Sequence, residues 1–405
     1  MSHNNEKEAL LFHRKGRAGK IEIIPTKPSN SAEDIALAYS PGAHFPSGCI
    51  NKEKWNAYRY TNKGNLIGLL SDGTESMASK PLMEGKSMLM KTFADIDAFD
   101  IEINNSSESA LIRTAHSIAP TFGALSIGGI RNCNGLHLQK ALQQILDIPV
   151  FHDEAYGTAI VITAAVINHL KHIKKDASEI RTVFIGNNET AQATVDFLKE
   201  EGFEHNHTLT AQNAEITSNG LEGYEVIICT DKEYTPAPES FVNVAANAAI
   251  ILLSPYIYYD GIRKNSPTSS LFTGNIKMPN YIDSILVSPY VFRAALDTLA
   301  ININKQMIKA AIKSIAMVAE AENKNTGALL PTYKSKRLAT EATEAIAQAA
   351  IDSGIARRKI VNWREYHHTL LSRLERIYNM TQHIRYYNKN NSRLHRRYMR
   401  AAPEF

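Results

Sequence analysis

Four side chains in this sequence could move protons or bind a cation. Tyr39 lies within the string Leu-Ala-Tyr-Ser-Pro-Gly, Lys86 ends the string Met-Glu-Gly-Lys, and Asp153 is followed directly by Glu154. Adjacent carboxylates supply the negative charge that a hard divalent cation needs. A lysine acts as a base near neutral pH only where burial or a neighbouring positive charge lowers its pKa. Without their sequence context, Lys86 could equally be a lysine on a helix surface and Tyr39 an aromatic side chain packed in the core. The surrounding motifs therefore determine whether we interpret them as site residues.

A second candidate site follows the β-branched run at 181–185, where the chain reads Gly186-Asn187-Asn188-Glu189 before a helical pattern at 189–201. A dinucleotide fingerprint needs glycines, so that the backbone can approach the pyrophosphate at a helix N-terminus. Gly186 is present, but Asn188 brings a side chain to the point of closest approach. Glu189 adds a negative charge in the first helical turn, which opposes a phosphate there. Gly186 and Asn188 remain the candidate cofactor contacts, on a domain that we expect not to bind NAD in the usual way.

The elements that must position these residues alternate between strand and helix. Strand-like runs stand at 21–24, 66–70, 96–103, 148–151, 181–185, 208–210, 226–230 and 249–253, and an apolar helix is expected at 159–172. Such alternation predicts parallel sheets of the doubly wound kind. From residue 292 the pattern is mostly helical, through 301–323 and 335–353. We therefore expect an α/β protein with an N-terminal α/β domain (1–155), a Rossmann-like domain with C-terminal helices (156–370) and a basic tail (371–405).

Composition limits the class of protein. A length of 405 residues favours two domains, and 44% hydrophobic with 21% charged residues is typical of globular proteins. The net charge of +4 is too small to indicate a nucleic-acid partner. Residues 381–400 carry six Lys or Arg and no acid, which fits a solvated terminus, with an RNA-binding or docking arm as the alternative.

Cysteine spacing and the lack of long apolar runs point to a cytoplasmic protein. Cys49, Cys133 and Cys229 lie far apart, which predicts neither a disulfide framework nor a zinc site. Residues 1–7 lack the apolar core of a signal peptide, and no apolar stretch is long enough to span a membrane.

Ten strings in one order and spacing, from residue 19 to 354, carry a family resemblance. They are Gly19–Glu22 with Pro25–Pro28, Leu37–Gly42, Tyr60–Leu66, Ser79–Lys86, Phe99–Asn104, Pro120–Gly123, Pro149–Asp153, Gly157–Ile160, Phe292–Asp297 and Ala349–Gly354. In this arrangement the chain resembles the malic enzymes, which oxidise and decarboxylate malate with NAD or NADP and Mg²⁺ or Mn²⁺. The phosphotransacetylase-like extension of many bacterial members is absent from this sequence.

The resemblance implies roles for several residues. In the family a lysine and a tyrosine act as base and acid, and the matching positions are Lys86 and Tyr39. Lys80 is implied as a nearby auxiliary group. Asp153 matches the later of three metal ligands. The resemblance also implies a homodimer formed through the N-terminal region and a small carboxylate substrate.

The sequence departs from the family where the metal should bind. The adjacent Glu-Asp pair of the family falls at Gly128-Gly129, and no acid lies between Glu108 and Asp147. Glu154 beside Asp153 leaves a rearranged two-carboxylate site open. We expect weak metal binding, because one ligand of three remains.

The positions expected near the substrate also differ. The family's Asn-Pro reads Ser254-Pro255, and its Asn-Gln-Val-Asn-Asn motif reads Asn280-Tyr281-Ile282-Asp283-Ser284. Asp283 would repel a dicarboxylate such as malate. A Gly-Leu-Gly loop expected between residues 74 and 78 is missing, leaving Glu75-Ser76-Met77, and the ribose-binding acid is replaced near Gln212.

These observations support three hypotheses. The leading one is a diverged malic-enzyme homologue that lacks ordinary metal- and NAD(P)-dependent decarboxylation of malate but keeps Tyr39 and Lys86 for enolisation or decarboxylation of another small carboxylate. The second is an active malic enzyme whose metal ligands come from Glu154 or Asp283. The third is a non-catalytic homologue that acts by binding.

Overall fold

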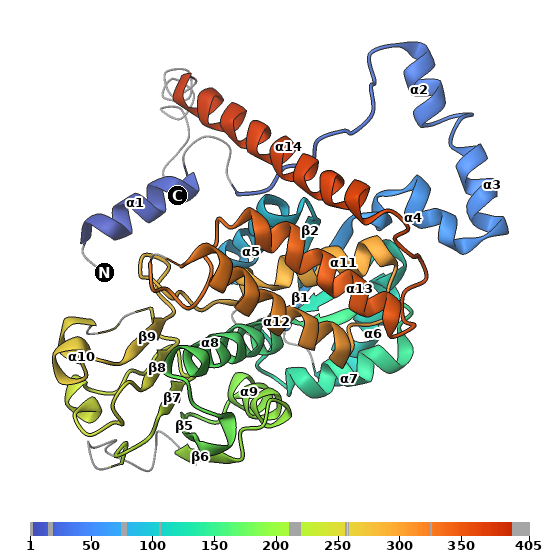
Figure 1. The fold of residues 1–405 in the computed structure, drawn as a ribbon. Helices are drawn as coiled ribbons and strands as arrows, with labels where there is room; N and C mark the ends of the chain where they lie inside the picture. Colours follow the sequence, from blue (N-terminus) through green and yellow to red (C-terminus); the bar gives the residue numbers. More distant parts are fainter. Residues whose placement is uncertain are drawn as a thin grey trace.

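The computed structural model describes residues 3–14, 19–73, 79–104, 107–209, 220–255, 257, 259–324 and 326–390. Two parallel sheets lie side by side in these residues, with helices packed against and between them (Figure 1). The α/β class expected from the sequence is therefore confirmed.

The first sheet has four parallel strands in the order β2-β1-β3-β4. They are β1 (Leu66–Ser71), β2 (Asp97–Glu102), β3 (Ala124–Ile127) and β4 (Val150–His152). Helices α5 (Lys80–Ala94), α6 (Glu108–Ile118) and α7 (Gly135–Ile145) connect them. Since side chains alternate along a strand, Ile67 and Leu69 join one buried cluster while Leu66 and Leu70 join another on the opposite face.

The second sheet has five parallel strands in the order β6-β5-β7-β8-β9. They are β5 (Arg181–Ile185), β6 (His205–Leu209), β7 (Val226–Cys229), β8 (Ala249–Leu252) and β9 (Ser270–Thr273), with α9 (Glu189–Glu200), η7 (Pro238–Phe241) and α10 (Tyr259–Asn265) between them. The central strands are apolar on both faces because helices or loops cover both sides of the sheet.

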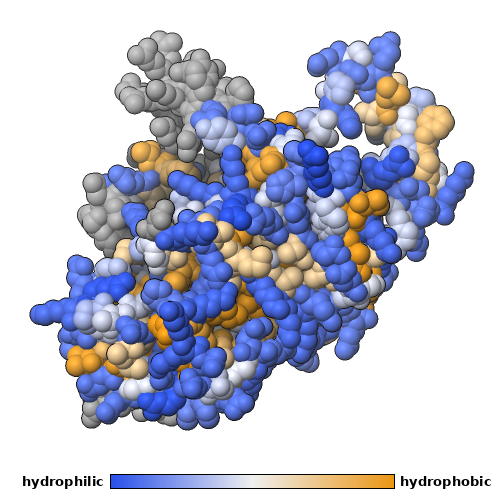
Figure 2. All heavy atoms as spheres, in the orientation of Figure 1, coloured by the Kyte–Doolittle hydropathy of each residue, from blue (hydrophilic) through white to orange (hydrophobic). Residues whose placement is uncertain are grey.

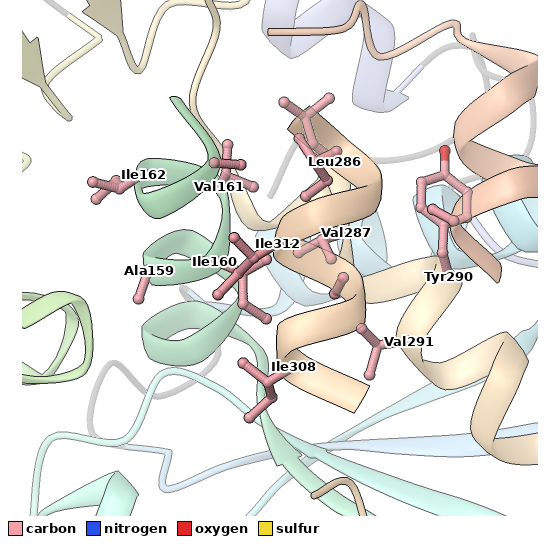
Figure 3. Packing of buried hydrophobic residues seen from close by; sticks show 14 of the residues in the cluster. Ala159, Ile160, Val161, Ile162, Leu286, Val287, Tyr290, Val291, Ile308 and Ile312 are labelled. Atoms are coloured by element: carbon pink, nitrogen blue, oxygen red, sulfur yellow. The ribbon is translucent and has the colours of Figure 1, made fainter. Parts of the chain in front are cut away.

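One hydrophobic core joins the two sheets. Helix α8 (Thr158–Ile173) buries 12 of its 16 residues, as expected for a helix that is apolar all round. Ile160 and Val161 point toward Ile308 and Ile312 of α12 (Lys305–Glu322), whereas Ala159 and Ile162 point to the other side of α8 (Figure 3). Leu286 and Val287, just before α11 (Ser288–Thr298), and Val291 of α11 belong to the same buried cluster. The same cluster includes Ile67 of β1 and Phe184 of β5, so the halves share their interior.

The C-terminal part is helical, as expected, and ends in a long helix. After the π-helical turn η9 (Leu338–Ala342) and α13 (Thr343–Asp352), α14 (Trp363–Asn390) crosses over α5 (Figure 1). Leu370 and Ile377 of α14 are buried, and Arg376 pairs with Asp95 after α5. Residues 371–390, expected to form part of a basic tail, therefore belong to a helix, while 391–405 lie outside the described residues.

The N-terminal part forms an arm that projects from the body (Figure 1). It comprises α2 (Ala32–Ala38) and α3 (His44–Lys52) and is preceded in the chain by α1 (His3–Arg14). η1 (Lys54–Asn56), α4 (Ala57–Tyr60) and η2 (Asn62–Gly64) lead from the arm to β1, and Lys63 of η2 donates to the Phe122 carbonyl of the body. Helices α2 and α3 have no buried residue, and apolar side chains lie on their surface (Figure 2). The strand expected at 21–24 is wrong: these residues have no regular secondary structure, are mostly exposed, and have no ladder partner among the described strands.

Most other predicted strands are confirmed, but two were missed. The runs at 66–70, 148–151, 181–185, 226–230 and 249–253 coincide with β1, β4, β5, β7 and β8 to within two residues. The missed strands, β3 and β9, have only four residues each and follow Gly123 and a serine-rich turn. Among the described helices, none is long and apolar enough to cross a membrane.

Candidate functional site

Lys86 and Asp153 meet at the carboxyl edge of the first sheet. Lys86 lies on α5, whose first turn carries Pro81 and so tolerates the missing N–H. Asp153 follows β4 and opens the π-helical turn η5 (Asp153–Gly157). The Lys86 Nζ lies 3.4 Å from Asp153 Oδ1, and the Asp153 side chain is only 2% exposed. The lysine and the aspartate singled out in the sequence are thus brought together.

Gly128 lies directly beside this pair. A Cβ built on Gly128 would be 2.8 Å from Lys86 Nζ and 3.2 Å from Asp153 Oδ1. Gly129, the next residue, has a φ of +65°, a left-handed conformation that favours glycine. A side chain at position 128 would therefore point at Asp153, where the family resemblance expects a carboxylate.

Glu154 is held from two directions. Its Oε1 lies 2.7 Å from Lys232 Nζ, and its Oε2 accepts a hydrogen bond from the Gly129 N–H at 3.4 Å. The Lys86 and Lys232 ammonium groups lower the pKa of Glu154 well below its usual range, against the opposing effect of burial. Lys232 follows β7 of the second sheet, so this ion pair crosses between the halves of the molecule.

The electrostatics at Lys86 favour the ammonium form. Burial by itself lowers the pKa of Lys86, but the Asp153, Glu154 and Asp283 carboxylates outweigh it, and the pKa is raised above its usual value. Lys86 can therefore donate a proton at neutral pH, whereas a general base would need the opposite shift.

Tyr39 is not brought to Lys86 within one chain. It caps the C-terminus of α2 and is 79% exposed. Figure 1 shows α2 on the projecting arm, away from α5. The tyrosine and the lysine can therefore meet only if the arm packs on another surface.

The candidate cofactor residues have structural partners. Gly186 directly follows β5 and has a φ of +102°, and a Cβ there would lie 3.1 Å from Thr230 Oγ1. Asn188 is the N-cap of α9: its Oδ1 accepts from Ala191 N–H and its Nδ2 donates to Thr230 O, both at 3.0 Å. The next side chain, Glu189, contacts the first half of the molecule through the Gly135 N–H and His152 Nε2.

The expected substrate-side residues are spread over several places. Lys80 pairs with Asp100 on β2, and this hydrogen bond raises the lysine pKa. Asn280 has a φ of +56°, and its side chain bonds the backbone of Leu329 and Leu271. Ser254 is buried after β8.

Asp283 caps η8 (Ser284–Leu286) through the Ile285 N–H and acts electrostatically on Lys86. Asp283 is thus the substrate-side residue whose charge acts on Lys86.

Two residues at the site were missed in the sequence. Lys232 pairs with Glu154, and Asp72, after β1, accepts from the backbone N–H groups of Arg131 and Asn132. Both follow parallel strands, and the rule that ligand-facing residues lie beyond carboxyl strand ends could have found them. Within the described ranges no three His, Cys, Asp or Glu side chains form a metal-binding group. The missing loop at 75–77 and the position near Gln212 lie outside the described residues.

Two parallel sheets that share one core, with charged residues at the carboxyl edge of the first, define an α/β protein with two parallel-sheet halves. No protein-family model matches the chain. It is 32% identical over 406 residues to an NADP-dependent malic enzyme of Halomonas elongata, covering 88% of this chain and 96% of that protein. The chain therefore belongs to the malic enzyme family.

Further comparisons agree with this assignment. An NADP-dependent malic enzyme of Salmonella typhimurium is 30% identical over 90% of this chain, which spans 55% of that longer protein. The chain thus covers about half the length of several curated relatives. The crystal structure of malic enzyme from Pyrococcus horikoshii matches with a TM-score of 0.84 and 28% identity, covering 96% of this chain and 100% of that one.

Proposed function

We propose that this protein does not carry out the ordinary metal- and NAD(P)-dependent oxidative decarboxylation of malate. We propose instead that it uses the Lys86 ammonium for enolisation or decarboxylation of another small carboxylate. The observation that carries this proposal is the Lys86–Asp153 ion pair beside Gly128.

The ligand set around Asp153 does not fit a divalent cation. Asp153 would be one ligand, but Gly128 and Gly129 offer no side-chain oxygen, and a lysine ammonium already neutralises the carboxylate at 3.4 Å. A bound divalent ion would have to displace this cation. The positive charge at the site therefore comes from Lys86 itself.

A fixed ammonium suits reactions that develop negative charge on oxygen. Loss of CO₂ next to a carbonyl group leaves the electron pair of the broken bond as an enolate, and a neighbouring cation stabilises it. Lys86 is protonated at neutral pH, so it can then deliver a proton to this intermediate. Neither step needs hydride transfer to a dinucleotide.

The start of α9 supports the same proposal. A dinucleotide phosphate would approach the helix N-terminus, where Asn188 Oδ1 already accepts an N–H and the Glu189 carboxylate adds a negative charge. Both groups oppose an anion at this position.

The arm supports a homodimer in which Tyr39 acts on a second copy. Ile35, Leu37 and Phe45 on the arm are 56%, 75% and 76% exposed, which is unusual for side chains of this size within one short segment. Packing the arm on another copy would bury them and bring Tyr39 to a site that it does not reach in its own chain.

The test of function is a turnover assay with a rescue variant. The protein is assayed with malate, Mn²⁺ and NAD or NADP, and we expect no turnover above background. The variant Gly128→Glu/Gly129→Asp restores the family's acidic pair, and we expect it to gain Mn²⁺ binding, measured by calorimetry. Robust turnover by the unaltered protein would refute the proposal.

An active malic enzyme with a rearranged metal site is the second candidate. The observation in its favour is that the Asp153, Glu154 and Asp283 carboxylates all act to raise the pKa of Lys86. This candidate predicts that Lys86→Met, which removes the competing cation, raises the affinity for Mn²⁺ at least as much as the glycine-to-acid variant does.

A further inference from the structure

Glu189 connects the two halves of the molecule through its carboxylate. It is the first residue of α9 in the second half, and its two oxygens accept from groups of the first half. Oε1 accepts from the Gly135 N–H at 2.5 Å, and Oε2 is 2.7 Å from His152 Nε2. Gly135 is the first residue of α7, so its N–H has no partner within its own helix.

The hydrogen-bond partners of His152 determine which of its ring nitrogens carries the proton. Nδ1 lies 3.3 Å from the Ala155 N–H and must accept from it, so the proton of the neutral ring is on Nε2 and is donated to Glu189. The His152 side chain is 4% exposed. His152 is also the N-cap of η5, the turn that carries Asp153 and Glu154. Glu189 is thus connected, through one ring, to the turn that holds the candidate site.

Gly135 leaves the space for this contact. A Cβ on Gly135 would lie 2.4 Å from His152 Nε2 and 3.0 Å from Glu189 Oε2. The three groups therefore fit together only with a glycine at position 135.

We propose that Glu189 is a positioning residue, an internal anion that holds His152, η5 and the start of α7 in place without a bound ligand. The proposal rests on the proposed absence of a dinucleotide at α9, because the same helix N-terminus would otherwise face a phosphate. The carboxylate sits at the first turns of both α7 and α9, and both helix dipoles favour a negative charge there. One wall of the Lys86–Asp153 site is then assembled permanently by the protein itself.

The test compares Glu189→Gln with Asp196→Asn in the full chain without ligand. Asp196 is exposed on the same helix, so its variant makes the same change of charge away from the contact. A carboxamide has one acceptor oxygen where the carboxylate has two, so Glu189→Gln loses one of the two hydrogen bonds. We expect hydrogen exchange of the Gly135 amide to be about tenfold faster, or the His152 ring proton to move to Nδ1. The Asp196→Asn protein should show neither change.

The readouts are amide exchange and ¹⁵N shifts of histidine-labelled protein, with the His152 signal assigned by its loss in His152→Gln. Gly135→Ala approaches the contact from the other side and should displace His152 while Glu189 is intact. Unchanged Gly135 exchange and an unchanged His152 tautomer in folded Glu189→Gln would overturn the proposal. Turnover of malate by the unaltered protein would refute the proposed function, but it would leave these ligand-free readouts as they are.

Discussion

At the residue scale, the glycine at position 128 determines which group pairs with Asp153. With glycine at position 128, Lys86 is the partner of Asp153, whereas a side chain there would crowd the lysine ammonium. The lysine then keeps its proton, because the surrounding carboxylates raise its pKa. We propose that the loss of both family acids, at Gly128 and Gly129, leaves Lys86 as the cation of this site.

The Lys86–Asp153 pair should show strong coupling in a double-mutant cycle. Lys86→Met leaves the Asp153 carboxylate buried without this partner, and we expect a loss of about 3 kcal/mol in the free energy of unfolding. Lys86→Met combined with Asp153→Asn should recover much of it, because the uncompensated charge is gone. Urea unfolding measures both, and simple additivity of the two single variants would contradict the predicted coupling.

His169 should make stability depend on pH. Burial, assisted by the neighbouring His172, lowers the pKa of His169 to about 4. The unfolded chain takes up a proton below about pH 6.5 while the folded chain resists, so stability is lost as the pH falls from about 6.5 to 4. The loss amounts to on the order of 3 kcal/mol at the acid end.

Urea unfolding near pH 7 and about pH 5 tests this dependence. His169→Leu should unfold with a smaller difference between the two pH values than the unaltered protein does. The exposed His116, changed to Gln, is the control and should leave the difference as it was. An equal pH dependence in all three proteins would argue against His169 as its source.

At the scale of elements, the long C-terminal helix is tied to the body by a buried ion network. Asp297 of α11 accepts from Arg293 Nε at 2.9 Å and from the Tyr366 hydroxyl of α14 at 2.9 Å, and Arg373 lies 3.5 Å away. Arg293 is 2% exposed, so its charge depends on this partner. The network explains why residues that look like a basic tail form an ordered helix.

Graded changes in this network should give graded losses of stability. Tyr366→Phe removes one hydrogen bond to a charged group and should cost about 1–2 kcal/mol. Asp297→Asn leaves buried Arg293 without its counter-charge and should cost about 3 kcal/mol or more. Chemical denaturation gives both values, and an equal effect of the two substitutions would show that the charge is not what anchors α14.

At the scale of the whole molecule, the shared core joins the two sheets into one body, whereas the projecting arm leaves its apolar side chains exposed. The cluster through α8 holds the two sheets in one body. The arm packs little against that body, since α2 and α3 bury no side chain of their own. An arm of this composition needs a partner, and a second copy is the partner that we propose.

Light scattering after size exclusion should therefore report a dimer. Leu37→Glu together with Phe45→Glu should convert it to a monomer, because a charge placed in an apolar interface loses its hydration. The control Val242→Glu alters a residue that is 53% exposed and follows η7 in the second half of the molecule, and the dimer should survive. A monomeric unaltered protein at micromolar concentration would refute the arm-mediated dimer.

The sequence by itself determined the alternation of strands and helices and the family, because apolar periodicity and strings in register are local properties of the chain. It also located Lys86 and Asp153, and the loss of acids at Gly128 and Gly129. It did not predict the short strands β3 and β9, whose four residues become strands only through pairing with neighbours.

Only the tertiary structure decided which groups meet. Lys232 and Glu154 are far apart in sequence and pair because the edges of two sheets face each other. The raised pKa of Lys86 depends on Asp153 and Asp283, which come from different parts of the chain. Tyr39 and Lys86 belong to one family pattern, yet an exposed arm separates them in space. Such contacts depend on how distant parts of the chain pack together, so the sequence around each residue does not predict them.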